Sequence, residues 1–156
     1  MNLENGFQTM SYEKMESNDL PEVLFMEAAS SLNPWSKAMF IEEMQNPFAH
    51  CFITKRKEAS KHLVMGFICF RMVGDESELF KICVHPQYRQ LGIGKNMMQF
   101  YIDFCYKAEI KDYYLEVNAS NQAAIHLYQM FSYQPVGTRK KFYQSKFDAL
   151  LMVKKV

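Results

Sequence analysis

The chain has 156 residues, which is enough for one domain with a sizeable core. Hydrophobic residues make up 49% and charged residues 22%, a composition that argues against intrinsic disorder. The formal net charge of +1 gives no overall basic surface for nucleic acid or an anionic membrane, although it leaves room for a local basic patch.

The beginning of the chain is polar, because residues 1–12 lack the apolar segment of a signal peptide. No run approaches the ~20 apolar residues that a membrane span needs. Four cysteines stand at wide, irregular spacings without a C-x-x-C pair: Cys51, Cys69, Cys83 and Cys105. This spacing argues against a zinc ribbon or a thioredoxin-like site, and no other metal-binding constellation is visible. The sequence therefore predicts a cytoplasmic protein with reduced, buried thiols and no metal.

Periodicity and turn residues predict the elements in chain order. Residues 1–7 form an irregular start, and residues 18–21 (Asn-Asp-Leu-Pro) mark a helix entry, with a capping residue ahead of a proline. Ser36, after an Asn-Pro break, can cap a second helix. The expected elements are a strand at 7–15, helices at 23–31 and 36–45, strands at 48–54, 63–72 and 78–84, a helix at 93–105, a strand at 113–117, a helix at 121–131, and strands at 133–143 and 147–154.

The order of these elements predicts one mixed α/β sheet with helices on its faces, in a single domain over residues 1–156. The charged segment 55–61 is expected to be a solvated hairpin tip between two of the strands.

The segment 84–95 (VHPQYRQLGIGK) lies between a strand and the start of a long helix. A helix N-terminus leaves backbone N–H groups without internal partners, and these groups can bind an anion. Gly92 and Gly94 remove side chains that would hold a phosphate away from the backbone, and Arg89 and Lys95 add positive charge. The segment therefore predicts a pyrophosphate site, and the alternative is that the glycines only shape a tight turn.

Two commoner phosphate motifs are excluded at this turn. A Walker loop needs glycine at the position of Arg89 and Ser or Thr at the position of Asn96. A dinucleotide fingerprint needs a third glycine where Met97 stands.

The same residues resemble a known family. Residues 89–94 (RQLGIG) are similar to the R/Q-x-x-G-x-G/A signature of the GNAT acetyltransferases. Residues 114–128 (YLEVNASNQAAIHLY) resemble the L-E-V-R-x-S-N-x-x-A-x-x-L-Y segment of the ribosomal-protein-alanine N-acetyltransferases (RimI), and the likeness covers roughly residues 10 to 155.

The resemblance implies a mixed, mostly antiparallel GNAT sheet, acetyl-coenzyme A as co-substrate, and a protein N-terminus as acceptor, with no direct contact to nucleic acid or membrane. It implies that Glu116 is the general base and Tyr128 the general acid. It also implies that these residues bind the coenzyme: Ile82, Cys83, Val84, Arg89, Gln90, Leu91, Gly92, Ile93, Gly94, Lys95 and Asn121.

The residues themselves suit acetyl transfer, which needs a neutral amine, a stabilised oxyanion and a proton for the departing thiolate. Glu116 lies near the end of an apolar strand, where a carboxylate is rarely placed without a role. Helical spacing puts Asn121, Ala124 and Tyr128 on one face, and a phenol with a pKa of about 10 can donate its proton at neutral pH. The alternatives are a merely solvated glutamate and a tyrosine that only packs in the core.

The acceptor remains open. At pH 7 an α-amine is roughly one-tenth neutral, whereas less than about a thousandth of a lysine is neutral, which weakly favours a peptide N-terminus. Acetylation of a small amine or of lysine is the alternative, and a non-catalytic acyl-coenzyme A-binding module is an alternative of another class. His85 and His126 are expected to have no catalytic role.

Three further features bear on the site. Ser132 stands where the family has glycine, so it must accept or avoid the left-handed helix cap. The connection at 144–146 is shorter than the family's loop, which forms one wall of the peptide cleft. The basic segment 139–141 is expected to be a solvated strand end, with a phosphate or substrate contact as the alternative.

Overall fold

The computed structural model describes residues 10–58, 61–143 and 146–156. Its elements in chain order are β1 (Met10–Lys14), α2 (Leu20–Ser30), α3 (Lys37–Gln45), β2 (Ala49–Glu58), β3 (Lys61–Val73), β4 (Glu76–Val84), α4 (Ile93–Lys107), β5 (Asp112–Asn118), α5 (Gln122–Met130), β6 (Gln134–Tyr143) and β7 (Phe147–Lys155). The predicted order of strands and helices is confirmed. The predicted irregular start at 1–7, residues 7–9 of the first predicted strand, and residues 144–145 of the last connection lie outside the described residues.

The helices begin where their capping residues predict. Pro21 lies in the first turn of α2. The Ser36 Oγ accepts a hydrogen bond from the Met39 N–H at 3.2 Å and so caps α3. Asn121 caps α5 in the same way, because its Oδ1 accepts from the Ala124 N–H at 3.1 Å.

The predicted solvated tip at 55–61 is wrong in extent, since β2 continues to Glu58 and β3 already begins at Lys61. After a register shift between Thr54 and Lys55, the two strands remain paired, with Arg56 opposite Leu63. A hairpin can extend through charged residues because its hydrogen bonds belong to the backbone. Lys55 has an ion-pair partner in Glu13 of β1, at 3.2 Å.

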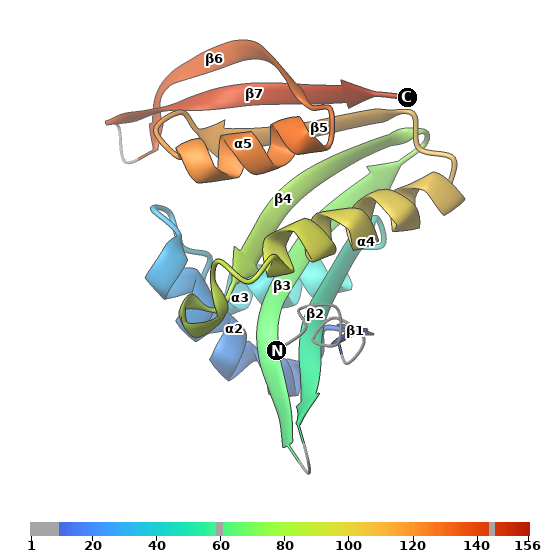
Figure 1. The fold of residues 1–156 in the computed structure, drawn as a ribbon, viewed down its shortest axis with the longest axis vertical. Helices are drawn as coiled ribbons and strands as arrows, with labels where there is room; N and C mark the ends of the chain where they lie inside the picture. The colour runs from blue at the N-terminus through green and yellow to red at the C-terminus, as the bar shows by residue number, and fades with distance from the viewer. Residues whose placement is uncertain (1–9, 59–60, 144–145) are drawn as a thin grey trace.

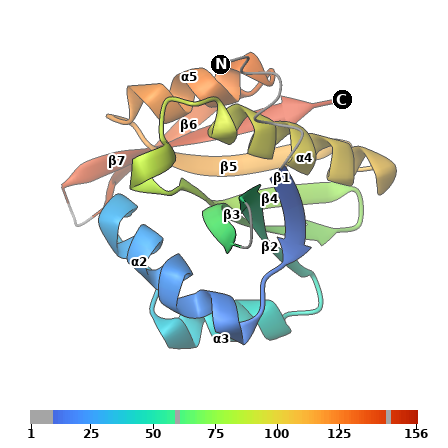
Figure 2. The same ribbon diagram turned by 60° about the horizontal axis from the view of Figure 1, so that its bottom comes forward.

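All seven strands form one sheet in the order β1-β2-β3-β4-β5-β7-β6. Neighbouring strands are antiparallel, except that β4 and β5 are parallel. Helices α2 and α3 cover one face of this sheet and α4 and α5 the other (Figures 1 and 2). The predicted mixed, mostly antiparallel sheet with helices on both faces is therefore confirmed.

Each face of the sheet has its own hydrophobic core. On one face, α4 contributes Met97 and Tyr101, which are fully buried. On the other, α2 contributes Val23 and Met26 and α3 contributes Phe40, also fully buried. Burial of each such side chain stabilises the fold by about 1.5–3 kcal/mol, so both helical layers are fixed firmly to the sheet.

Gly66 on β3 allows α4 to lie close to the sheet. A Cβ atom at this position would be 2.5 Å from the Cys83 backbone oxygen and 3.0 Å from the Met97 Sδ. Only glycine fits between β4 and α4 without a shift of the backbone.

The two parallel strands pair only at their beginnings. The register runs from Glu76 opposite Asp112 to Leu79 opposite Leu115, and past these residues β4 and β5 diverge, as Figure 1 shows toward its left side. Beyond Leu79, the edge of β4 that faces β5 has no strand partner among the described residues. The sheet is thus split at the carboxyl ends of its central strands, and this split forms the candidate site.

Candidate active site

The turn into α4 has the backbone geometry of an anion site. Gly92 is the N-cap and adopts a left-handed conformation, with φ of 79°. The Asn96 N–H donates to the Gly92 carbonyl at 3.1 Å, which leaves the N–H groups of residues 93–95 as the open donors of the first turn. No described side chain caps this end of the helix, so the amides and the helix dipole can act on a ligand.

The predicted residues around this turn differ in how they are placed. The Arg89 guanidinium donates to the Ser30 Oγ at 2.6 Å and to the Val84 carbonyl at 3.4 Å, so it ties the turn to α2 and β4. Leu91 is 45% exposed. A Cβ atom on Gly94 would be 3.5 Å from Leu127 Cδ2, which shows that the start of α4 packs closely beside α5.

A cleft of about 180 Å³ lies in the split between β4 and β5. Its lining brings together predicted residues from three elements: Ile82 and Cys83 of β4, Glu116 of β5, and Asn121 and Tyr128 at the start and in the body of α5. The other predicted coenzyme contacts follow along the chain: Val84 ends β4, residues 89–92 lie in the turn, and residues 93–95 begin α4.

Glu116 has a partner that the sequence does not indicate. Its Oε1 lies 2.9 Å from the Arg139 guanidinium, and the Glu116 side chain is 25% exposed. Arg139 also lies over the Phe142 ring, 4.7 Å from its centroid. The predicted exposure of residues 139–141 is confirmed, since the Arg139 side chain is 53% exposed, but the ion pair with Glu116 was not predicted. The contact forms because Leu151 of β7 pairs with both Glu116 and Gly137, so one strand separates β5 from β6 and a long side chain spans it.

Tyr128 is held by the end of its own helix. Its side chain is 7% exposed and lies 6.0 Å, centroid to centroid, from the Tyr133 ring. The Tyr133 N–H donates to the Tyr128 carbonyl at 3.2 Å, and the Ser132 N–H donates to the Gln129 carbonyl at 3.0 Å. These two bonds form a Schellman motif, in which Ser132 takes the left-handed position with φ of 69°. Ser132 therefore accepts the conformation that glycine favours, and the motif packs Tyr133 against Tyr128.

A buried ion pair beside the cleft was missed by the sequence analysis. The Lys81 Nζ of β4 lies 2.9 Å from the Glu27 Oε2 of α2, and the exposed fractions of their side chains are 17% and 3%. The same carboxylate oxygen accepts from the Trp35 N–H at 3.1 Å, and the ammonium lies 5.3 Å from the Trp35 ring centroid. A signal was available, because Glu27 continues the apolar face that begins at Leu20 and Val23.

The described part of the chain also bears on metal-binding groups, the histidines His85 and His126, and membrane-spanning helices. It holds no group of three or more His, Cys, Asp or Glu side chains that could bind a metal ion. The His85 Nδ1 accepts from the Gln87 N–H at 3.1 Å and so caps a short turn, while His126 is exposed on α5. None of the helices in the described ranges is both long and apolar enough to cross a membrane.

Comparison with known proteins agrees with this architecture. The model of the Acetyltransferase (GNAT) family matches residues 18–133. A Bacillus subtilis protein, provisionally named a ribosomal protein bS18-alanine N-acetyltransferase, is 33% identical over 140 residues, which are 88% of this chain and 90% of that protein.

Solved structures share the whole fold. The crystal structure of the ribosomal-protein-S18-alanine N-acetyltransferase from Escherichia coli superposes with a TM-score of 0.83 at 29% identity, and covers 94% of each chain. The NatC complex bound to Gag peptide and CoA shares the fold at 16% identity, with a TM-score of 0.81 over 94% of this chain and 98% of that chain. The resemblance read from residues 89–94 and 114–128 is thereby confirmed. This chain belongs to the GNAT family of acetyltransferases.

Proposed function

We propose that this enzyme transfers the acetyl group of acetyl-coenzyme A to the N-terminal α-amine of a protein, and that its substrate is a ribosomal protein, bS18, that begins with alanine. The observation that carries the proposal is that Glu116 and Tyr128 line the same cleft, in the split between β4 and β5. The choice of acceptor is supported by the names of the Bacillus subtilis and Escherichia coli relatives. Synthesis of ribosomal proteins in the cytoplasm makes that compartment the expected location.

The donor fits two features of the backbone. The edge of β4 at residues 82–84 can hydrogen-bond the amide groups of the pantetheine arm, because β5 has already diverged from it there. The open amides at the start of α4, with Gly92 and Gly94 beside them, suit the pyrophosphate. Asn121 uses its side-chain oxygen to cap α5, so its amide nitrogen is the group that is proposed to contact the coenzyme.

Proton transfer is assigned to the two side chains that line the cleft. Glu116 takes the proton of the acceptor ammonium, directly or through one water, and the neutral amine then attacks the thioester carbonyl. Tyr128 gives its phenolic proton to the departing thiolate. Since Arg139 pairs with Glu116, an arriving ammonium group must compete with the guanidinium for the same carboxylate.

A thiol-release assay with acetyl-coenzyme A and short peptides that differ only at the first residue tests the acceptor. We expect the fastest turnover with the alanine peptide that matches the start of bS18. Faster acetylation of free lysine side chains or polyamines would reject the N-terminal assignment in favour of the alternative acceptors.

The catalytic roles have separate tests. Glu116→Gln and Tyr128→Phe are each expected to lower kcat about 10²–10⁴-fold, while calorimetry finds the coenzyme bound as tightly as by the wild type. Turnover that is unchanged in Glu116→Gln would remove that residue as the base. Loss of coenzyme binding in both variants would show that Glu116 and Tyr128 contribute to coenzyme binding and not to proton transfer.

A further inference from the structure

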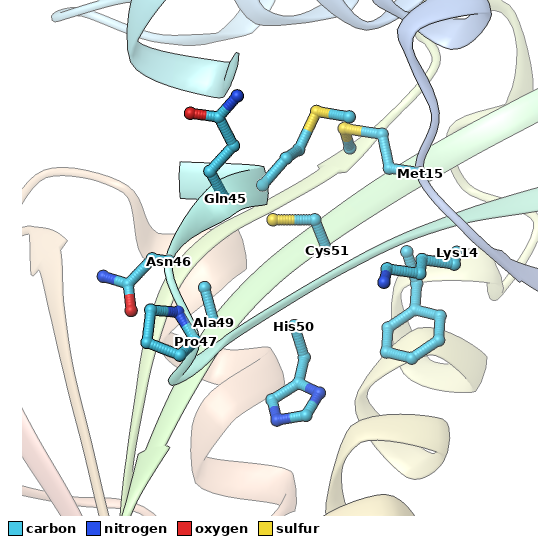
Figure 3. Close-up of a pocket in the computed structure, with 10 residues that line it drawn as sticks. Lys14, Met15, Gln45, Asn46, Pro47, Ala49, His50 and Cys51 are labelled. Carbon is cyan, nitrogen blue, oxygen red and sulfur yellow. The ribbon is translucent and has the colours of Figure 1, made fainter. Parts of the chain in front are cut away.

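A second cleft, of about 370 Å³, lies where β1 ends beside the first residues of β2. Figure 3 shows its lining, which includes Lys14, Met15, Gln45 and Cys51, with His50 on the opposite side of β2 from Cys51. The Met15 N–H donates a hydrogen bond to the Cys51 carbonyl at 2.9 Å, so the chain after β1 is still bonded to β2 at Cys51. Cys51 is 6% exposed and lines this cleft, whereas Cys69 is fully buried.

Cys51 lies directly opposite a second thiol. In the antiparallel pairing of β2 and β3 its Cα partner is Cys69, which is fully buried. Directly opposite residues in an antiparallel pair have Cα atoms about 4.5 or 5.5 Å apart, depending on their hydrogen-bonding position, and both separations fall within the range of disulfides, about 4.4–6.8 Å. Directly opposite residues carry their side chains on the same face of the sheet, so the two thiols are neighbours. A hydrogen bond to Cys51, together with burial, also raises the pKa of Cys69 well above its usual value.

The other cysteines are less well placed for cross-linking. Cys69 has Lys81 as its partner on β4, and Cys83 is two residues further along that strand. Such diagonal neighbours have Cα atoms about 7–8 Å apart, beyond the usual range for a disulfide. Cys105 belongs to the core on the opposite face of the sheet.

From this geometry we infer that Cys51 and Cys69 are a peroxide-sensitive dithiol that closes to a disulfide. Cys51, at the cleft, takes one oxygen atom from hydrogen peroxide, which leaves as water, and becomes a sulfenic acid. The Cys69 sulfur then attacks the Cys51 sulfur and displaces hydroxide, which takes up the Cys69 proton and leaves as a second water. Two thiols are oxidised and one peroxide is reduced, so no further reactant is needed.

The bond would act one strand away from the catalytic cleft. Cys51, Cys69 and Lys81 occupy one row across β2, β3 and β4, and Lys81 lines the cleft as the partner of Glu27. The inference rests on this row and on the second cleft, and it holds whatever the acceptor of the enzyme is.

Peroxide treatment of the reduced full-length protein, followed by N-ethylmaleimide in denaturant and mass spectrometry, tests the inference. We expect alkylated thiols to fall from four to two, with a tryptic cross-link between the peptide that contains Cys51 and the one that contains Cys69. Dithiothreitol should restore all four. The cross-link should be absent from Cys51→Ser and Cys69→Ser and present in the matched control Cys105→Ser.

The thiol count and the cross-link are measured on the wild-type protein, so the test remains decisive even if one of the variants fails to fold. Four alkylated thiols after peroxide, oxidation of Cys51 to a sulfinic acid without a cross-link, or a cross-link that contains Cys83 or Cys105 would each overturn the inference.

Discussion

Replacement of Lys81 by methionine tests the ion pair that joins α2 to β4 beside the cleft. Methionine keeps much of the apolar stem but removes the ammonium, and this leaves the Glu27 carboxylate, 3% exposed, with the Trp35 N–H to stabilise its charge. Removal of one partner from a buried pair costs about 3–5 kcal/mol, and the partial exposure of Lys81 puts this case near 3. For a chain of this length, about 3 kcal/mol corresponds to a fall in Tm of roughly 6–12 °C.

Replacement of the partner, Glu27, should lower the free energy of unfolding by less. In Glu27→Gln the Lys81 side chain, 17% exposed, can turn its ammonium toward water, and glutamine can still accept from Trp35. We expect a loss of about 1–2 kcal/mol for this variant. The double variant Glu27→Gln/Lys81→Met leaves no unpaired charge, so its cost should be at least about 1 kcal/mol below the sum of the single costs.

Urea unfolding followed by circular dichroism, with equal m-values for all four proteins, measures this cycle. Single costs that simply add, or a Lys81→Met cost below about 0.5 kcal/mol, would show that the pair behaves like an exposed surface salt bridge, and the reasoning from burial would fail.

Three further perturbations follow from the fold. Gly66→Ala should lower the free energy of unfolding by about 2 kcal/mol, since the new Cβ would lie 2.5 Å from the Cys83 oxygen. The control Gly137→Ala places its Cβ 3.4 Å from a flexible Leu151 methyl and should change the free energy of unfolding by less than about 0.5 kcal/mol. Equal urea midpoints for the two variants would contradict this prediction. Ser132→Gly should raise the unfolding free energy by up to about 1 kcal/mol, because it relieves the left-handed backbone at φ of 69°, and a lower urea midpoint would count against that strain. A hydrogen bond from the Lys141 N–H and, to a smaller extent, the Lys140 ammonium lower the pKa of Asp148. The Asp148 carboxylate therefore stabilises the fold fully above its unfolded pKa of about 3.9, and this stabilisation is lost as the pH falls through the lower pKa of the folded state. The stability gap between wild type and Asp148→Asn should therefore shrink from pH 7 to pH 2, and a constant gap would exclude the effect.

Most of the fold could be predicted because its elements carry local signals. Pro21, Ser36 and Asn121 mark helix starts through contacts within a few residues, and the apolar period of α4 needs no tertiary information. The extent of the β2–β3 hairpin could not be predicted, because the backbone pairing of its charged residues leaves no pattern of apolar side chains. Glu116 and Tyr128, the two residues proposed for catalysis, could be predicted because both lie in one continuous family motif, residues 114–128.

The partners of these residues follow a different rule. Arg139 reaches Glu116 across β7, and Lys81 reaches Glu27 between a strand and a helix, so both ion pairs depend on the order of strands and on layer packing. Spacing along the chain can indicate that Glu27 is buried, but it does not identify the partner of either carboxylate. Ser132 could be predicted only in part. The sequence indicates that a serine stands at the position of a left-handed helix cap, but the packing of Tyr133 on Tyr128 determines that Ser132 adopts this conformation.

The parted ends of β4 and β5 also link ligand binding to folding. In the free protein, main-chain groups along the inner edge of β4 must remain hydrated, so this seam in the sheet adds less to cohesion than a continuous ladder would. A molecule that completes the seam binds the folded chain and not the unfolded one, so at saturation each tenfold rise in its concentration adds about 1.4 kcal/mol to the unfolding free energy. The melting temperature of this protein should accordingly serve as a gauge of whatever occupies the gap.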